Sequence, residues 1–449
     1  MRGVKKLSTK EVLDLEKEEL QERIFSQKKL IEKMSDYHAF VYVEESPEIK
    51  GPSIGVKDNI CVKGKPVTAC SRILEGYVAV YDATAYKKIK NETTFLGKTS
   101  CDPFGCGSSG AGSDFGRTKH PFDPKRVPGG SSGGNGTALA LGMIDLALGT
   151  DTFGSARAPA SFCGVVGMRP SYGIVSRHGL LDLSMSLDVV SPMARDVFGV
   201  AWVLSKIVGK DDSDLTTTSV KIDLDLLDVD VKKPRIGVLK EEMLKEVDHG
   251  ILKLLEQKIR IIDVEVTEVD FPLSLEDIVK AYYILMPAEF SSSMQRYSGL
   301  LFGKRVGNKW EDFFQLTRSE LLSEELKRRI AVGTFVTMKE KKSKYYEKAL
   351  SVFSKFRTEI ERLFKSLELD AIITPTMPVV PWKFGEVQDP TKVYLMDVLT
   401  GIASAGGLPA ISIPIGEVKS LPVGMQIIGR RFHDARVLRL ARMYEEGLK

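Results

Sequence analysis

The sequence predicts a layered α/β fold. Over most of the chain, short apolar segments typical of strands alternate with segments whose apolar residues recur at helical spacing. The 449 residues are 43% hydrophobic and 28% charged, which is typical of a globular protein with a large core. Because no internal repeat or low-complexity linker interrupts this alternation, we expect one large domain rather than several independent ones.

The first part of the chain, residues 1–50, is predicted to be a helical segment that packs on the core. Its apolar residues recur every three or four positions over residues 8–46. The main domain is then expected to span residues 51–449. It begins with a predicted short strand in residues 53–61, SIGVKDNIC, and continues with a helix and then a strand over residues 82–98.

The later elements follow from the same two periodicities. After a Gly/Ser-rich loop at residues 105–116, TALALGM is predicted as a helix, IDLALGT as a strand and DTFGS as a tight turn into the next helix. A mostly helical excursion is expected at about residues 240–365. Further strands are predicted at RIGVLK, LDAIITPTMP, AISIPIG and VGMQIIG.

Charge and composition exclude several functional classes. A net charge of +4, from 64 basic and 60 acidic residues, is too weak to indicate nucleic-acid binding by electrostatics. The basic run KEKKSK at residues 339–344 is predicted to be the solvated face of a long amphipathic helix.

No apolar run is long enough for a membrane helix and no signal peptide is visible, so we expect a cytoplasmic protein without membrane contact. The five cysteines match no Cys-x-x-Cys pattern and predict reduced, buried thiols and no metal site: Cys61, Cys70, Cys101, Cys106 and Cys163.

The stretch PGGSSGGNGTALALGMIDLALGTDTFGSARAPA, residues 128–160, has three possible interpretations. As a phosphate cradle it lacks the Gly-Lys-Ser/Thr ending of a P-loop. As a structural turn it would use its glycines for positive φ and close packing. As a nucleophile region it offers Ser131 and Ser155, and a serine nucleophile needs a base.

Lysine is a candidate for that base. None of the five histidines lies in a Gly-rich turn, although a Ser-His-Asp triad assembled from distant residues stays possible. Lys57 lies within the mostly apolar SIGVKDNI. Burial disfavours a charged ammonium and lowers its pKa, which is the property that a catalytic lysine needs.

Three ordered motifs resemble the amidase signature family: VKDN (56–59), PGGSSGG (128–134) and GTDTFGSARAPASFCGVVGMRPSYG (149–173). The resemblance covers nearly the whole chain. It implies a single large amidase domain with a mixed central β-sheet covered by helices on both faces. It also implies a Ser-cisSer-Lys triad in which Ser155 is the nucleophile, Ser131 relays the proton from a cis peptide, and Lys57 is the base. The backbone N–H groups of Thr152, Phe153 and Gly154, with that of Ser155, would form the oxyanion hole.

Within this family, GCGSSGAGSDFG, SYGIVSRHGLL and LDVVSPMARDVFGVAWVLSKIVGKDDSD resemble the A subunits of glutamyl-tRNA(Gln)/aspartyl-tRNA(Asn) amidotransferases. Such a subunit is a glutaminase whose ammonia amidates Glu-tRNA(Gln) or Asp-tRNA(Asn). The resemblance implies that glutamine is held by Arg329, Asp397, Tyr282 and Ser108. Guanidinium suits an α-carboxylate and a carboxylate suits an α-ammonium.

The same resemblance implies the partners. The chain would form a heterotrimer with a large kinase-like subunit, which binds tRNA, and with a small subunit that wraps around this chain. The chain itself would need no cofactor, and ATP and magnesium would be used by the large subunit.

Two residues beside the nucleophile depart from the family pattern. Phe153 replaces a glycine, and a positive φ there would strain a phenylalanine. Ala158 replaces a glutamine. Asp151 and Arg157 are predicted to be structural partners that fix the turn. Two alternatives therefore stay open: a stand-alone amidase acting on another amide, which would not need Arg329 or Asp397, and a non-catalytic subunit that binds partners.

Overall fold

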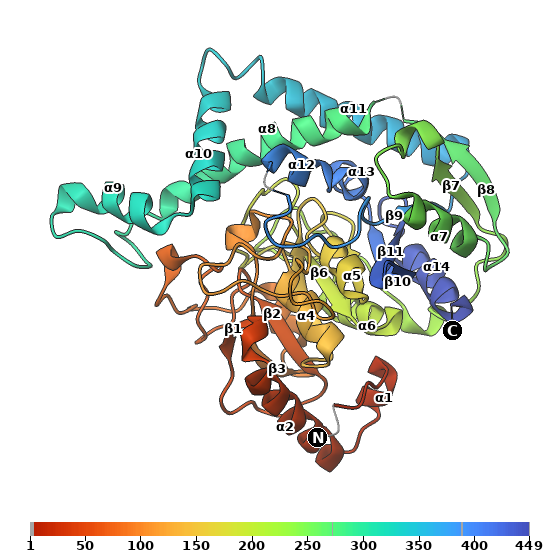
Figure 1. The fold of residues 1–449 in the computed structure, drawn as a ribbon, viewed down its shortest axis with the longest axis horizontal. Coiled ribbons are helices and arrows are strands. Elements are labelled where there is room, and N and C mark those ends of the chain that lie inside the picture. Colours follow the sequence, from red (N-terminus) through yellow and green to blue (C-terminus); the bar gives the residue numbers. More distant parts are fainter. Residues whose placement is uncertain (1–3, 272, 388, 449) are drawn as a thin grey trace.

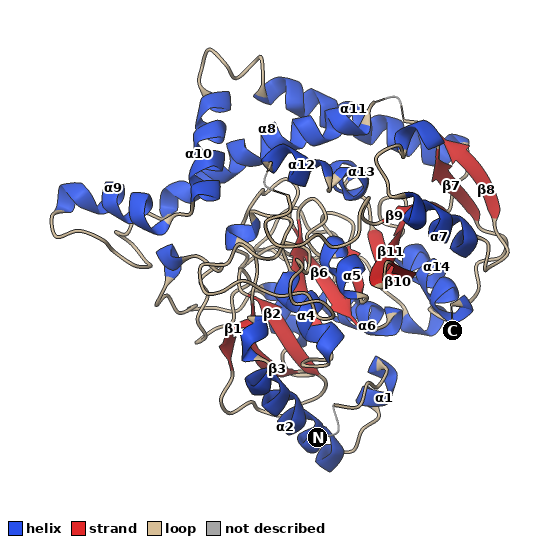
Figure 2. Cartoon of the chain, viewed as in Figure 1, coloured by secondary structure: helices blue, strands red, loops and turns tan. Residues whose placement is uncertain are grey.

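The computed structural model describes residues 4–271, 273–387 and 389–448. In this part of the chain, eleven strands form one sheet in the order β1-β3-β2-β4-β6-β5-β10-β11-β9-β7-β8 (Figures 1 and 2). The pairs β2–β3, β2–β4, β7–β8 and β7–β9 are parallel and the others are antiparallel. The strands are β1 (Phe40–Val43), β2 (Ser53–Lys57), β3 (Thr94–Thr99), β4 (Leu146–Asp151), β5 (Val166–Arg169), β6 (Val189–Ala194), β7 (Arg235–Leu239), β8 (Glu265–Val269), β9 (Ala371–Pro375), β10 (Ala410–Val418) and β11 (Leu421–Ile428).

Helices cover both faces of this mixed sheet, which confirms the predicted fold class. Along β4, Leu146 and Leu148 enter one hydrophobic cluster, whereas Ala147 enters a second, because successive side chains of a strand point to opposite faces. The helices are α1 (Thr9–Leu13), α2 (Lys17–Lys33), α3 (Thr84–Ile89), α4 (Gly133–Leu141), α5 (Arg157–Cys163), α6 (Val197–Ile207), α7 (His249–Ile259), α8 (Leu275–Ser293), α9 (Trp310–Leu321), α10 (Glu324–Thr337), α11 (Tyr346–Ser366), α12 (Pro390–Leu395), α13 (Val398–Gly406) and α14 (Asp434–Gly447).

The N-terminal segment is joined to the sheet by a buried ion pair. Arg23 of α2 contacts Asp145, just before β4, at 2.6 Å. Apolar residues of α2, among them Ile24, share a cluster with α4. The prediction of helix over residues 8–46 is wrong at its C-terminal end. Residues 40–43 form β1, which is antiparallel to β3. Their sequence, FVYV, consists of β-branched and aromatic residues, and these favour strands.

The helical excursion forms a layer beside the sheet, from which α9 projects (Figure 1). The prediction that the basic run at 339–344 lies in a long amphipathic helix is wrong. The run lies in the turn between α10 and α11. Helix α10 ends because Met338 takes an extended conformation, with φ −56° and ψ 143°. The division at residue 50 stays a prediction.

Three features of the described residues concern membrane spans, metal ligands and cysteines. No helix among them is both long and apolar enough to cross a membrane. No group of three His, Cys, Asp or Glu side chains in the same residues could hold a metal ion. All five cysteines are buried and free.

Candidate active site

The sheet brings the three triad candidates to one edge. Strands β2 and β4 are parallel neighbours, so Lys57 and the turn after Asp151 emerge at the same end. The Nζ of Lys57 donates a hydrogen bond to Ser131 Oγ at 2.7 Å. The backbone N–H of Ser132 donates to the carbonyl of Ser155 at 3.0 Å, which fixes the two serine segments against each other.

Lys57 is held where its charge is unfavourable. Its side chain is 0% exposed and Nζ also donates to Thr150 Oγ1 at 2.8 Å. Burial lowers the pKa of Lys57 below its usual value, although the neighbouring Cys101 and Asp102 oppose that shift. The two hydroxyl partners satisfy the amine without supplying a counter-charge, so the charged form is less favourable than it is in water.

Ser131 follows a cis peptide bond from Gly130, as the resemblance implied. Asp102 anchors the loop that faces it: its carboxylate accepts the N–H groups of Gly110 and Gly112, each at 2.8 Å, and its own N–H donates to the carbonyl of Ser131 at 3.2 Å. A Cβ on Gly130 would lie 2.2 Å from Asp102 Oδ2, so this position accepts only glycine.

The turn that carries Ser155 is built around one buried carboxylate. Asp151 accepts the N–H of Gly154 at 3.0 Å and that of Ala156 at 3.2 Å. Arg157 and Arg169 also contact it, at 2.9 and 3.2 Å, with all three side chains 0% exposed. Burial would raise the pKa of Asp151, but the two guanidinium groups outweigh it and hold that pKa well below its usual range. This geometry agrees with the structural role predicted for Asp151 and Arg157.

The turn also presents backbone donors. Because Gly154 N–H donates to Asp151, it is already engaged. The N–H groups of Thr152, Phe153 and Ser155 have no acceptor within the described part of the chain. Gly154 supplies the turn's conformation, with φ +134°. The oxyanion-hole role of this turn stays a prediction, and of its predicted donors Gly154 N–H is engaged by Asp151 in this structure.

The strain considered for Phe153 does not arise. Its φ is not positive; the positive φ is at Gly154. The Phe153 ring stacks on Tyr282 of α8, with centroids 3.9 Å apart and planes at 7°. The ring also packs on Gly401 of α13, where a Cβ would lie 2.5 Å from Phe153 Cζ.

Two predicted substrate residues are in direct contact. Ser108 Oγ donates to Asp397 Oδ2 at 2.5 Å, which joins the Gly/Ser-rich loop to the start of α13. Burial raises the pKa of Asp397 to about 7, although the bond from Ser108 and the charge of Arg329 lower it. Arg329 therefore lies near enough to Asp397 for its charge to act on the carboxylate.

Arg329 is held by residues that sequence reasoning did not identify. Its Nε donates to Glu325, one turn earlier on α10, at 2.6 Å. Its guanidinium lies 5.8 Å from the ring centre of Tyr283 and 5.9 Å from that of Tyr394. Tyr283 adjoins the predicted Tyr282 in sequence, and that adjacency was a usable signal, whereas nothing in the sequence indicates that Tyr394 lies close to them.

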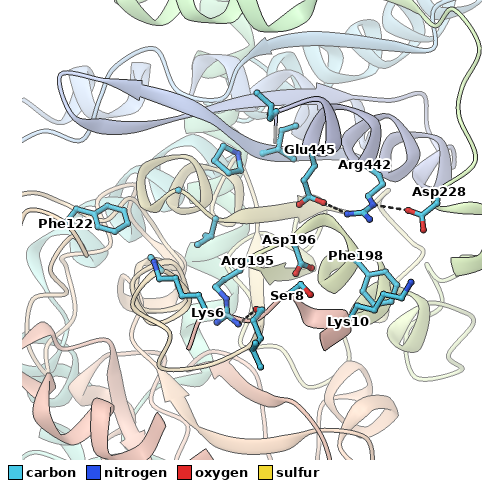
Figure 3. Close-up of a pocket in the computed structure, with 17 residues that line it drawn as sticks. Lys6, Ser8, Lys10, Phe122, Arg195, Asp196, Phe198, Asp228, Arg442 and Glu445 are labelled. Atoms are coloured by element: carbon cyan, nitrogen blue, oxygen red, sulfur yellow. Dashed lines mark hydrogen bonds and ion pairs between the residues drawn. The ribbon is translucent and has the colours of Figure 1, made fainter. Parts of the chain in front are cut away.

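A separate cavity of about 560 Å³ lies away from the triad, between the N-terminal segment, the start of α6 and α14 (Figure 3). Its lining mixes apolar and charged side chains, and three of the charged ones form ion pairs with each other. Arg442 contacts Asp228 at 2.9 Å and Glu445 at 2.8 Å. Its lining includes none of the predicted site residues.

The chain is similar to known proteins over nearly its whole length. The model of the family described as Amidase matches residues 23–438. The A subunit of the glutamyl-tRNA(Gln) amidotransferase of Thermotoga maritima is 39% identical, over 99% of this chain and 95% of that protein. The protein of that name from Clostridium botulinum strain Langeland is 42% identical, over 91% of this chain and 86% of its own length.

Solved structures give the same picture. The crystal structure of the Thermotoga maritima protein superposes with a TM-score of 0.85 at 38% identity, covering 98% of this chain and 94% of that one. A bacterial aryl acylamidase of the amidase signature family has a TM-score of 0.84 at 23% identity and shares the fold.

Proposed function

The chain belongs to the amidase family, and from that premise we propose that it is the glutamine-hydrolysing component of a tRNA-dependent amidotransferase. The observation that carries the proposal is the 2.7 Å hydrogen bond from the buried amine of Lys57 to Ser131 Oγ, beside the turn that presents Ser155. Burial lowers the pKa of Lys57, which a lysine that acts as a base requires. A relative that is 39% identical over 99% of this chain is named as the A subunit of a glutamyl-tRNA(Gln) amidotransferase.

The proposed acylation step uses the three side chains in series. Neutral Lys57 takes a proton from Ser131, which takes one from Ser155. Ser155 Oγ then forms a bond to the side-chain amide carbon of glutamine. As the tetrahedral intermediate collapses, the carbon–nitrogen bond breaks and the proton returns through Ser131 to the leaving nitrogen, so that ammonia departs.

The developing oxyanion would be held by the N–H groups of Thr152, Phe153 and Ser155, which lack an acceptor within the described residues. One such donor contributes about 3–4 kcal/mol to the transition state. Water then attacks the acyl carbon and passes a proton through Ser131 to Lys57. The proton returns to Ser155 Oγ as the ester bond breaks, which releases glutamate and restores Ser155.

Glutamine recognition is assigned to the opposite end of the site. Arg329 would pair with the α-carboxylate and Asp397 with the α-ammonium, with Ser108 orienting Asp397 and Tyr282 beside the carbon chain. A fatty or aromatic amide offers neither charge, which is why this pair favours glutamine over the alternative of an unrelated amide substrate.

The ammonia would amidate Glu-tRNA(Gln) or Asp-tRNA(Asn) on a partner. We propose a cytoplasmic heterotrimer with a large subunit that binds the tRNA and uses ATP and magnesium, and with a small subunit wrapped around this chain. The steps assigned to this chain require side chains and water, so the cofactors are assigned to the partner.

The test is ammonia release from glutamine, by the full chain and by the chain with the proteins that copurify with it. Ser155→Ala, Ser131→Ala and Lys57→Ala should each abolish release, and circular dichroism should show an unchanged fold. Release that persists in Lys57→Ala would overturn the proton path.

Arg329→Gln and Asp397→Asn separate glutamine from other amides. Both should raise KM for glutamine at least about tenfold, the value of one lost charge-assisted contact. Unchanged glutamine kinetics in both variants would favour a different amide substrate.

A further inference from the structure

Four aromatic rings connect the nucleophile turn to Arg329. Phe153 stacks on Tyr282 at 3.9 Å between centroids, Tyr282 meets Tyr283 edge-on at 4.8 Å, and Tyr283 stacks on Tyr394 at 3.7 Å. Arg329 faces the last two rings. We call these four side chains the aromatic column. They come from three separate segments: the turn after β4, helix α8 and helix α12.

At one end of the column, Phe153 is buried and closely packed. Phe153 is 3% exposed and Tyr282 is 4% exposed. Gly401 leaves room for the Phe153 ring and for nothing larger than hydrogen on its own Cα. The Thr400 hydroxyl also donates to the carbonyl of Phe153 at 2.7 Å. A shift of this ring would therefore move the backbone that carries the donors beside Ser155.

The other end is fixed by charge. Glu325 accepts from Arg329 Nε at 2.6 Å and from the hydroxyl of Tyr394 at 3.4 Å. Arg328 also contacts both Glu325 and Tyr394. The guanidinium is thus held between a carboxylate and two ring faces, and stacked rings have defined separations because their quadrupoles prefer particular geometries.

We propose that the aromatic column sets the distance between Ser155 and the Arg329 guanidinium, and thereby selects the chain length of the amide substrate. This rests on the proposed function, in which Arg329 binds the α-carboxylate while Ser155 attacks the terminal amide. In this scheme the separation would match an α-amino acid with a terminal amide of glutamine's length. Asparagine, one methylene shorter, would leave its amide carbon short of Ser155 Oγ when its carboxylate is on Arg329. Phe153 and Tyr283 are positioning residues in this scheme.

The experiment compares asparagine, glutamine and the amide one methylene longer, the 6-amide of 2-aminoadipic acid, on the full chain with its copurifying partner proteins. Variants are Phe153→Leu, which keeps the backbone N–H, and Tyr283→Leu. The matched control is Phe271→Leu, because Phe271 packs edge-on against Phe356 at 5.7 Å in another part of the core. Fluorophosphonate labelling of Ser155 reports the nucleophile without any amide substrate.

In the wild type, a one-methylene difference should give a preference for glutamine of roughly 10- to 200-fold in kcat/KM. Both column variants should lower that preference at least about fivefold, through a smaller kcat for glutamine with KM changed less than about threefold. Phe271→Leu should keep the wild-type preference.

Each other outcome has a distinct meaning. If the wild type hydrolyses glutamine and the variants lose rate equally on all three amides, or match the control, the column only supports the fold and the inference is wrong. If the wild type labels at Ser155 but hydrolyses none of the three amides, the proposed function fails and the inference fails with it.

Discussion

Replacing Asp151 by Asn should destabilise the protein by about 3–5 kcal/mol, the cost of removing one partner from a buried ion pair. The side chains of Asp151, Arg157 and Arg169 are all 0% exposed. Asn keeps the shape but leaves two buried guanidinium groups without their counter-charge. Since native proteins are stable by about 5–15 kcal/mol, this is a large share of the total.

The melting temperature should fall by only a few degrees. Unfolding entropy is about 2.1 cal/mol/K per residue, or about 0.9 kcal/mol/K for a chain of 449 residues. A loss of about 3–5 kcal/mol then corresponds to about 3–5 °C. Guanidinium unfolding followed by circular dichroism measures the free energy directly, with calorimetry for the melting temperature.

The control is Asp36→Asn, because Asp36 pairs with Lys119 at 2.9 Å with a 66% exposed side chain, where exposed pairs contribute about 0–1 kcal/mol. The pKa of Asp151 is lowered in the fold, so its stabilisation is present above the unfolded value near ~3.9 and is lost as pH falls toward the folded pKa. The difference between wild type and Asp151→Asn should therefore shrink below about pH 4. A loss under about 1 kcal/mol at pH 7, equal to that of Asp36→Asn, would refute the reasoning.

Four further outcomes are expected. Because burial raises the pKa of Asp397 to about 7, KM for glutamine should rise as pH falls below about 7, and Asp397→Asn should give a high KM that does not vary with pH; the same acid limb in both would contradict this. Because the pKa of Asp397 is raised in the fold, its carboxyl ionises at lower pH in the unfolded chain, and this lowers the free energy of unfolding as pH rises from about 4 to 7. Asp397→Asn should therefore flatten the pH dependence of the unfolding free energy across that range. Gly134→Ala should destabilise by more than about 1 kcal/mol in guanidinium unfolding, because its Cβ would lie 2.5 Å from the N of Ser100; a neutral effect would show that the backbone gives way. Lys342→Glu, in the exposed turn between α10 and α11, should change the unfolding free energy by less than about 0.5 kcal/mol, and a larger loss would mean that this turn is packed.

The fold class and the location of the site could be predicted from sequence because their signals are local. Helices α3 and α4 and strands β2, β3, β4, β7, β9, β10 and β11 fall where periodicity placed them. Lys57 ends β2 and Ser155 follows β4, so parallel pairing of these strands brings the two segments to one end of the sheet. Ser131 lies just before α4 and reaches them through loop contacts. The catalytic roles of Lys57, Ser131 and Ser155 stay predictions.

What failed depends on contacts between distant segments. The run at 339–344 has helical composition, but the chain must reverse between α10 and α11, and that requirement is tertiary. Glu325 and Tyr394 are separated by a long stretch of sequence, and their shared contact with Arg329 exists only once α12 packs beside α8. The engagement of Gly154 N–H by Asp151 likewise depends on how the turn closes.

The fit of Phe153 against Gly401 restricts the order in which such a pair can change. With glycine at 401, position 153 can carry either glycine or phenylalanine. With phenylalanine at 153, any side chain at 401 collides with its ring. A lineage that moves from glycine to phenylalanine beside the nucleophile can do so only if glycine already occupies the helix opposite. Once phenylalanine is at 153, glycine at 401 must stay until position 153 changes first.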